Sequence, residues 1–530
     1  MIKRYALLLA GAAGAALAPT MPAMAQQKAP LSILRVIDAD NYDPIRSTAT
    51  AAAEVMYMMA DTLVTVDFDM KTIKPGLAEN WSVSPDGMTY TFKLRKDVKF
   101  CDGRPMTIDD VVYSLKRWTD PANKSPVSFR GGPVKDIRAD GDSTLIYELK
   151  EPYSDLLFQL ALSFASVVDK NTVEKLGQNF GVQGFNGTGP YCWVKWTPRQ
   201  ELVLKKNPYY SWGPPIYKDP KPQIEDIVWK VIPESNTLMA AIQAKQADVT
   251  YYMPYIALDT MQRIPGMTVQ RQENYIYDIF MGFKVDKPVS KDPAIREAVN
   301  MAVDKQAIAK AIFFGKGTAL PSLLNPAVLD YDKDTAAKMP KHDPAGAIKV
   351  LEAAGWKPGA DGIREKDGQR ATFTVYGIRN DVNPRISEAM QADLRKVGID
   401  LKIQLWDATV AWGKLATQEF DAFYMSYPYV TATEALNLYF ASRQVPTPNR
   451  MNWKDPKTDE LLKAAATATD EKVRKEAIGT VQMQLTDANV WVPLASQPLW
   501  VVAGDRLEGV RAHGIYGAGL YKGLDIKLKR

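Results

Sequence analysis

The hydrophobic residues in the second half of the chain recur with the period of a helix. Residues 292 and 293 (Asp-Pro) are a helix start, and Ile295, Ala298, Val299 and Ala302 follow at i, i+3, i+4 and i+7. The same spacing predicts helices that contain Ile308 with Ile312, Ile348 with Leu351, and residues 386–397. These segments are predicted to bury one apolar face each.

Segments between these helices show the alternation of hydrophobic and polar residues that is typical of strands. The helix at residues 386–397 ends at Gly398, and Ile399, Leu401, Ile403 and Leu405 then alternate with polar residues. A further strand is predicted at residues 420–427. This helix–Gly–strand order is typical of α/β architecture, in which helices cover a sheet.

The first third mixes the two patterns. Tyr90, Phe92 and Leu94 alternate as a half-buried strand does, after a Pro-Asp-Gly turn. Thr107 with Asp110 fits a capping box, and the helix that it starts carries Val111, Leu115 and Trp118 on one face, which we expect to be core. The stretches 193–204 and 208–222 are read as strand and as a proline-rich surface crossing.

The N-terminus has the three parts of a secretory signal peptide. Lys3 and Arg4 precede an apolar run over residues 6–18, and residues 23–25 (Ala-Met-Ala) form a cleavage site. The run is too short for the ~20 residues of a membrane-spanning helix. Cleavage is expected after Ala25, and no cysteine follows for lipid attachment. We therefore expect a mature protein that is free in the periplasm and is not a lipoprotein.

Length and charge narrow the class of protein. A mature chain of about 500 residues is more than one core usually serves, so two or more domains are expected. The 66 Lys and Arg residues stand against 61 Asp and Glu residues, which is too even a balance to favour nucleic acid. Cys101 and Cys192 form one disulfide in an oxidising compartment or remain two thiols, and the sequence leaves both open.

Few residues in the sequence are candidates for catalysis or metal binding. The 2 histidines, His342 and His513, are isolated from cysteines and paired carboxylates, so neither a metal site nor a cofactor is expected. Nucleophile-elbow, zinc-protease and phosphate-loop motifs are missing from the sequence. A carboxylate-pair hydrolase stays an alternative because acids are plentiful, although no pair stands out.

Motifs along the chain resemble extracellular solute-binding proteins of family 5, the dipeptide-, oligopeptide-, nickel- and opine-binding components of ABC importers. The matching segments are residues 74–81 (KPGLAENW), 84–87 (SPDG), 90–95 (YTFKLR), 100–103 (FCDG), 109–111 (DDV), 187–191 (GTGPY), 207–210 (NPYY), 347–356 (AIKVLEAAGW), 391–394 (QADL) and 491–494 (WVPL). They are collinear over nearly the whole mature chain.

The resemblance implies a type II-like periplasmic binding protein fold, with two lobes joined by two crossing segments and a ligand enclosed between them. Lobe I would comprise residues 26–279 plus 487–530, with an extra subdomain at about 70–190 (the cluster C arrangement), and lobe II residues 280–486. A change of pattern near Met281 agrees with that boundary. Hinge closure around the ligand would create the form that an inner-membrane permease recognises.

The resemblance also suggests ligand contacts. Family dipeptide binders pair an Arg with the ligand carboxylate, and Arg379 is the candidate here because its planar fork matches a carboxylate. They pair an Asp with the ligand amine, but residues 425–434 contain no Asp, and Glu434 is the nearby acid. Either Glu434 substitutes or the ligand lacks a free amine there.

Aromatic residues are expected to line the cleft. Trp406, Trp412, Tyr427 and Tyr429 lie on or near the strands that would face the ligand, and Tyr42 and Asn41 lie in the family's first loop. The leading hypothesis is a monomeric importer component for a peptide or peptide-like solute. Alternatives are a carrier of an opine, a chelated metal or another small solute, a sensor or chaperone partner without a permease, and a periplasmic hydrolase.

Overall fold

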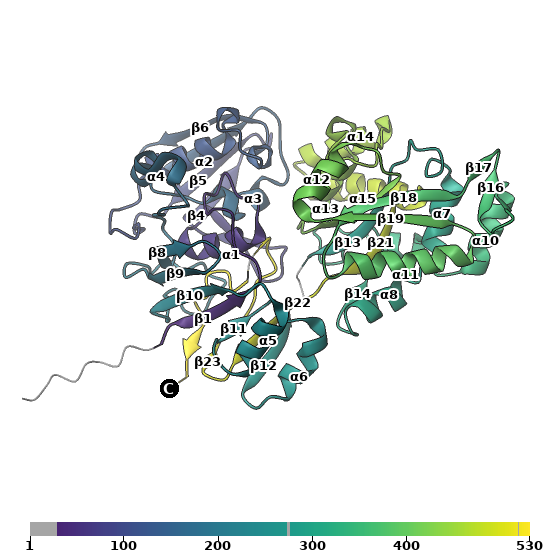
Figure 1. Ribbon diagram of the computed structural model, residues 1–530. Coiled ribbons are helices and arrows are strands. Elements are labelled where there is room, and N and C mark those ends of the chain that lie inside the picture. The colour runs from purple at the N-terminus through teal and green to yellow at the C-terminus, as the bar shows by residue number, and fades with distance from the viewer. Residues whose placement is uncertain (1–28, 273–275, 518, 530) are drawn as a thin grey trace, which may run out of the picture.

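Two lobes, each built around its own β-sheet, lie side by side (Figure 1). The computed structural model describes residues 29–272, 276–517 and 519–529. The signal peptide predicted for residues 1–25 lies outside the described residues. We use the name lobe I for the part around the seven-stranded sheet and lobe II for the part around the six-stranded sheet.

The sheet of lobe I is mixed. In spatial order its strands are β12 (Met267–Gln272), β22 (Leu499–Gly504), β11 (Val249–Thr250), β1 (Leu31–Arg35), β10 (Asp226–Val231), β9 (Glu201–Lys206) and β8 (Tyr191–Thr197). β1 runs parallel to β10 and β11 and is buried along its whole length. The single strand read from residues 193–204 is therefore a hairpin, because the chain turns between β8 and β9.

Helices α1 (Thr50–Met59), α5 (Ser235–Gln243) and α6 (Leu258–Arg263) belong to lobe I. Leu238 of α5 and Met261 of α6 pack with Val502 of β22 in one apolar cluster. α1 is buried over nine consecutive residues, Ala51 to Met59. Helices α5 and α6 therefore pack against β22, the strand that follows the second crossing from lobe II.

A four-stranded antiparallel sheet forms a separate layer of lobe I. Its strands, in order, are β4 (Ala78–Val83), β5 (Thr89–Leu94), β7 (Thr144–Leu149) and β6 (Val134–Asp140). α2 (Ile108–Thr119) packs on it and begins with the predicted capping box of Thr107 and Asp110. Val111, Leu115 and Trp118 are fully buried, so this amphipathic helix is confirmed as predicted.

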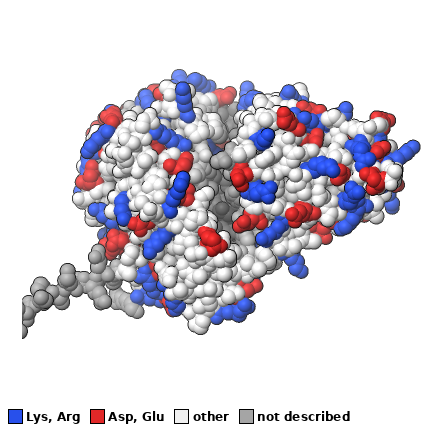
Figure 2. Space-filling model, viewed as in Figure 1, with Lys and Arg blue, Asp and Glu red and all other residues white. Residues whose placement is uncertain are grey.

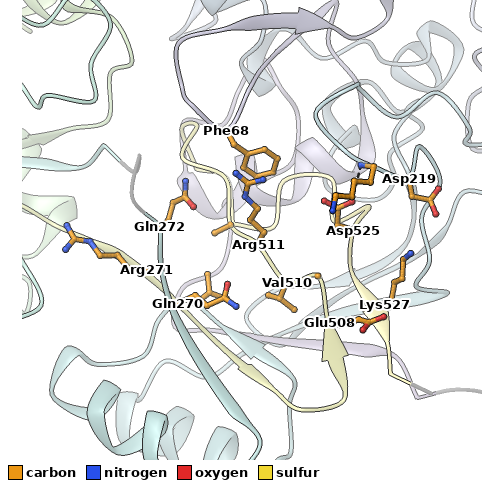
Figure 3. Close-up of a pocket in the computed structure, with 14 residues that line it drawn as sticks. Phe68, Asp219, Gln270, Arg271, Gln272, Glu508, Val510, Arg511, Asp525 and Lys527 are labelled. Atoms are coloured by element: carbon orange, nitrogen blue, oxygen red, sulfur yellow. Dashed lines mark hydrogen bonds between the residues drawn. The ribbon is translucent and has the colours of Figure 1, made fainter.

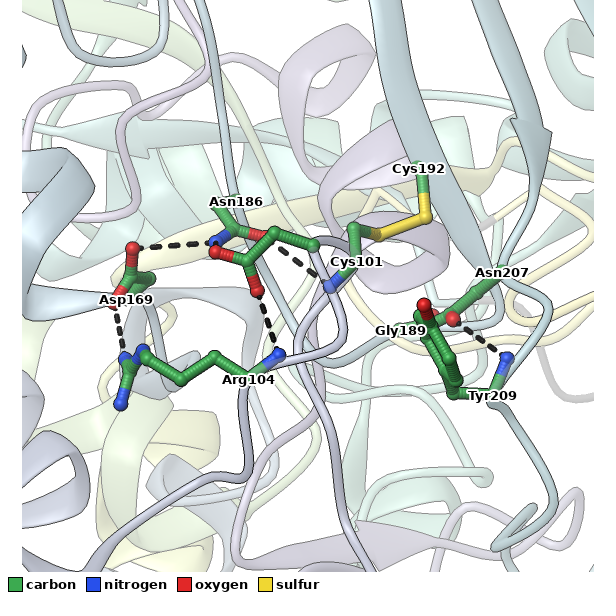
Figure 4. Close-up of a disulfide and its surroundings, with 9 residues drawn as sticks. Cys101, Arg104, Asp169, Asn186, Gly189, Cys192, Asn207 and Tyr209 are labelled. Carbon is green, nitrogen blue, oxygen red and sulfur yellow. Dashed lines mark hydrogen bonds and ion pairs between the residues drawn. A yellow bond between two sulfur atoms is a disulfide. The ribbon is translucent and has the colours of Figure 1, made fainter.

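A disulfide ties this layer to the main sheet of lobe I (Figure 4). Cys101 lies in the turn before α2, and Cys192 lies on β8. The backbone N–H of Cys101 donates to the carbonyl of Gly187 at 3.2 Å and to Oδ1 of Asn186 at 3.1 Å. Of the two states that the sequence left open, the structure has the bonded one.

The sheet of lobe II contains, in order, β14 (Thr318–Ala319), β21 (Trp491–Ser496), β13 (Asp278–Phe283), β20 (Ala422–Tyr427), β18 (Thr372–Ile378) and β19 (Asp400–Trp406). α11 (Asn383–Lys396) connects β18 to the parallel strand β19. Gly398, at φ +82°, makes the predicted turn between them. The predicted α/β class is confirmed.

Three further predicted features occur in lobe II. α7 (Pro293–Ala302) and α10 (Pro344–Ala353) begin at Asp-Pro pairs, and Asp292 and Asp343 accept backbone hydrogen bonds as N-caps. α8 (Lys305–Ile312) follows α7. Ile295, Ala298, Val299, Ile308 and Leu351 share one buried apolar cluster.

The remaining helices and strands complete the two lobes. They are β2 (Val64–Val66), β3 (Ile73–Pro75), α3 (Leu156–Gln159), α4 (Lys170–Leu176), α9 (Asp334–Lys338), β15 (Lys357–Pro358), β16 (Arg364–Lys366), β17 (Gln369–Arg370), α12 (Ala408–Ala416), α13 (Ala432–Phe440), α14 (Pro456–Thr467), α15 (Glu471–Asp487), β23 (Leu507–Glu508) and β24 (Lys527–Leu528). Within the described ranges, none of the helices has the length and apolar character needed to cross a membrane.

The chain passes between the two main sheets twice. β12 of lobe I ends at Gln272 and β13 of lobe II begins at Asp278. β21 of lobe II ends at Ser496, and Gln497 and Pro498 lead directly into β22 of lobe I. The exact residues that divide the lobes stay a prediction.

Candidate functional site

Two adjoining cavities, of about 360 Å³ and 340 Å³, lie where the lobes meet. Both are lined by Tyr251, Tyr252 and Tyr255 of lobe I, by Asp381 and Val382 of lobe II, and by Gln497 and Pro498 of the crossing segment. Figure 2 shows the groove between the lobes on one face of the molecule. A solute in these cavities would touch both lobes and a segment that joins them.

A buried acid lies in the lobe I wall. Glu54 of α1 is 2 % exposed, and its carboxylate accepts hydrogen bonds from the Trp229 indole N–H and the Tyr251 hydroxyl. Burial raises the pKa of Glu54, and the nearby Arg35 opposes that shift. Sequence reasoning missed Glu54, although one acid inside the apolar run of α1 was a usable signal.

An ion pair joins the two lobes. Arg130, in a short helical turn of lobe I (Ser128–Gly131), pairs with Glu434 in the first turn of α13. Arg130 Nη1 also donates to Gln159 Oε1 at 2.9 Å, and its guanidinium lies 5.7 Å from the ring centroid of Tyr429. Both charged side chains are nearly buried. The Glu434 carboxylate is thus directed at Arg130.

A second contact between the lobes lies beside this pair. Ser154 of lobe I donates its backbone N–H to the carbonyl of Ala466 on α14 at 2.8 Å. The neighbouring Asp155 is 3 % exposed, and burial, followed by repulsion from Glu434, raises its pKa to about 7. Closing the groove on this side therefore favours the protonated carboxyl of Asp155.

The stability of the protein is expected to fall as pH rises from about 4 to 7. The folded pKa of Asp155 lies above the value of about 3.9 for an unfolded aspartate, so the folded protein holds a proton there that the unfolded chain has lost. That contribution is complete below pH 4 and is lost as pH passes through 7. Urea unfolding at a series of pH values measures it.

Asp278 supplies the control for this pH effect. It is buried in β13, and burial raises its pKa to about 7 as well. Asp155→Asn should remove one part of the pH slope and Asp278→Asn another part. A slope that is unchanged in Asp155→Asn would show that this carboxyl ionises normally in the folded state.

The predicted aromatic residues differ in their surroundings. Tyr427 is fully buried, and its hydroxyl donates to the carbonyl of Leu323 at 2.9 Å. Tyr429 stacks on Tyr427 with ring centroids 5.7 Å apart, and it is half-buried near Arg130. Trp406 is half-buried at the end of β19, and Trp412 on α12 is 48 % exposed. The structure therefore brings Tyr429 and Glu434 together at one contact between the lobes.

The other predicted contact residues are Arg379, Tyr42 and Asn41. Arg379 is exposed after β18, next to the cavity-lining residues Asn380 and Asp381, and its Nη2 donates to the carbonyl of Leu405 at 3.2 Å. Tyr42 is fully buried and accepts a hydrogen bond from Arg35 Nη2 at 2.7 Å. The half-buried Asn41 accepts one from the backbone of Asp43. Ligand contact by these residues stays a prediction.

Another cavity, of about 740 Å³, belongs to lobe I alone (Figure 3). Residues of β12, of the C-terminal segment and of the loop at Asp219 line it, and the Arg511 guanidinium stacks 3.5 Å from the ring centroid of Phe68. No residue of lobe II lines it, so a solute bound there would not touch both lobes. Within the described ranges, no group of His, Cys, Asp and Glu side chains is placed to hold a metal ion.

The sequence of this chain is similar to those of known binding proteins. Residues 72–446 match the family described as bacterial extracellular solute-binding proteins, family 5 Middle. The oligopeptide-binding protein AppA of Bacillus subtilis is 25 % identical over 501 residues, covering 92 % of this chain and 90 % of AppA. The glutathione-binding protein GsiB of Escherichia coli K12 is 26 % identical over 480 residues, covering 89 % of each chain.

A solved structure extends the likeness to the fold. NikA from Brucella suis, in complex with Fe(III)-EDTA, superposes with a TM-score of 0.82 at 25 % identity, covering 94 % of this chain and 99 % of NikA. The predicted periplasmic binding protein fold is therefore confirmed. The family and these relatives are binding proteins, not enzymes. The chain belongs to the bacterial extracellular solute-binding proteins of family 5, and its function is solute binding.

Proposed function

We propose that this protein is the periplasmic binding component of an ABC importer and that it captures a peptide or peptide-like solute between its lobes. The observation that carries the proposal is the pair of cavities whose walls come from lobe I, lobe II and the crossing segment at once. Such a solute makes contacts in the closed form that it cannot make in the open form, so it shifts the population toward closure.

The closed form is what an inner-membrane permease would recognise. In this proposal the protein acts as a monomer, binds without chemical conversion and needs no cofactor. The tyrosine-rich walls suit a solute with apolar side chains, and Glu54 and the backbone of the crossing segment provide polar contacts. The names of AppA and GsiB, which refer to oligopeptides and glutathione, support a peptide cargo.

A ligand panel tests the proposal. Randomised di-, tri- and pentapeptide pools, glutathione, an opine and a nickel–histidine chelate are each added to the purified protein, and the melting temperature is recorded. A cargo at 100 times its Kd should stabilise the native state by about 2.7 kcal/mol. Native mass spectrometry then identifies the bound component and shows whether it leaves unchanged.

Three results would contradict parts of the proposal. If the opine or the chelate shifts the melting temperature and the peptide pools do not, the solute class is wrong but the carrier role stands. If a bound peptide leaves as fragments, the protein is a hydrolase. If nothing in the panel binds, the proposed role in peptide capture fails.

A further inference from the structure

The larger of the two cavities between the lobes has an acidic lining. We call this cavity, of about 360 Å³, the Glu54 cavity. Among the described residues that line it, the charged ones are Glu54 of lobe I and Asp381 of lobe II, and both are acids. The adjoining cavity of about 340 Å³ shares Asp381 and adds one cation, the exposed Arg385. The described walls of the Glu54 cavity therefore supply negative charge without a basic side chain.

Glu54 has no ion-pair partner of its own in the described part of the chain. The Arg35 guanidinium acts on it electrostatically but pairs with Asp38. Arg35 also donates to the hydroxyl of Tyr42 at 2.7 Å and to the carbonyl of Ala51 at 3.1 Å. Arg35, Asp38 and Glu54 thus combine two carboxyls with one guanidinium. A carboxylate that is removed from water without a cation is costly, so Glu54 gains from a cation that a solute brings.

The position of Glu54 at the cavity distinguishes it from the other buried acids. The other described carboxyls whose pKa is raised by burial are those of Asp155, Asp278 and Asp421. None of those three described residues lines either of the two cavities. Glu54 is nearly as buried as they are, yet it forms part of a wall that a solute can touch.

The hydroxyl groups near Glu54 are oriented to accept hydrogen bonds from a solute. The hydroxyl of Tyr251 donates to the Glu54 carboxylate, and that of Tyr255 donates to the carbonyl of Pro498 at 3.0 Å. Because a tyrosine hydroxyl has one hydrogen, both oxygens keep only lone pairs for a solute. The exposed Asp381 carboxylate receives no hydrogen bond from the described residues. The lining therefore offers oxygen acceptors from both lobes.

Tyrosine rings form much of the wall of the Glu54 cavity. The rings of Tyr251 and Tyr252 have centroids 5.7 Å apart, and Tyr255 packs edge-to-face on Phe313 of lobe II with centroids 5.1 Å apart. The three tyrosines are half-buried. The face of an aromatic ring attracts a cation within about 6 Å. A buried carboxylate among such rings suits a cation on a thin apolar stem, which is the form of a lysine or arginine side chain.

We infer that the Glu54 cavity binds a cationic side chain of the solute, an ammonium or a guanidinium with N–H donors, and that Glu54 is its counter-ion. A charge-assisted hydrogen bond is about twice as strong as a neutral one, and the pairing removes the cost of a buried carboxylate without a cation. Asp381 adds a weaker attraction because it is exposed to water. The inference rests on the proposed function and specifies it, because it requires a basic solute.

Matched peptide pools test the inference. Randomised tripeptides are prepared with lysine, arginine, norleucine or ε-N-acetyl-lysine fixed at each position in turn. At one position the wild-type protein should bind the lysine or arginine pool at least about tenfold more tightly than the norleucine and acetyl-lysine pools, because these keep the stem and lack the charge. Isothermal titration calorimetry measures the affinities.

Three variants assign the preference to a residue. Glu54→Gln keeps an oxygen for the hydrogen bonds from Trp229 and Tyr251 but removes the charge. It should reduce the preference to about threefold or less, which is the size of effect that an exposed charge such as Asp381 has. Asp381→Asn should reduce the preference by a smaller factor than Glu54→Gln does. Glu79→Gln changes an exposed glutamate on β4 of lobe I and should leave the preference unchanged. Circular dichroism and urea unfolding establish that each variant is folded.

The possible failures are distinct. If the wild-type protein binds the basic and the norleucine pools equally well, the inference is overturned and the proposed function stands; this comparison does not depend on any variant. If N-terminal acetylation weakens every pool and no fixed lysine or arginine strengthens binding, the cation is the terminal amine and the side-chain assignment is overturned. A preference that persists in Glu54→Gln and is lost in Asp381→Asn would overturn the role of Glu54. If no pool binds at all, the proposed function fails and the inference fails with it.

Discussion

The double variant Cys101→Ala/Cys192→Ala is expected to lose about 4–5 kcal/mol of unfolding free energy, because a cross-link restricts the unfolded chain more as its loop lengthens. The disulfide closes a loop with a sequence separation of 91 residues. It also joins the turn before α2 to strand β8 of the main sheet. Urea unfolding of the oxidised protein and of the double variant measures the difference.

Chemical reduction is the control for this prediction. The wild-type protein in dithiothreitol should unfold at the same urea concentration as the double variant in the same reductant, and the double variant itself should not respond to the reductant. The single variant Cys101→Ala should behave as the double variant does. A double variant with the urea midpoint of the oxidised wild-type protein would show that the hydrogen bonds around Cys101, to Gly187 and Asn186, suffice to hold the two layers together.

Much of the fold could be predicted because local patterns decide local structure. The Asp-Pro starts of α7 and α10 and the Thr107–Asp110 capping box each act within four residues, and the apolar faces that follow them are buried. The hairpin of β8 and β9 was missed because both strands have the same alternation, although Pro198 in the turn between them was a usable signal.

The site could be predicted only in part, because its contacts join distant residues. Arg130 and Glu434 are 304 positions apart, so no local pattern could pair them. Sequence reasoning predicted that Tyr427 and Trp412 both line the cleft, and it could not tell the core ring of Tyr427 from the half-exposed ring of Trp412.

Arg130→Met is expected to open the protein. The substitution removes the positive partner of Glu434 and leaves that carboxylate beside Asp155 in a buried contact between the lobes. Removal of one member of a buried pair costs about 3–5 kcal/mol when the remaining charge stays buried. Here the molecule can avoid that cost, because opening the groove returns Glu434 to water. The closed population should fall, the radius of gyration from solution scattering should rise, and affinity for the cargo should drop at least tenfold.

The charge of Glu434 decides whether this explanation is right. The double variant Arg130→Met/Glu434→Gln has no unpaired carboxylate at position 434, so it should recover most of the compactness and affinity that Arg130→Met loses. Because Asp155 lies in the same contact, the opening of Arg130→Met should also lessen as pH falls toward 4 and the Asp155 carboxyl takes up its proton, which removes its repulsion of Glu434. If the double variant is as open as Arg130→Met at every pH, the contact of the Arg130 guanidinium with the Tyr429 ring, rather than its ion pair with Glu434, holds the lobes together there.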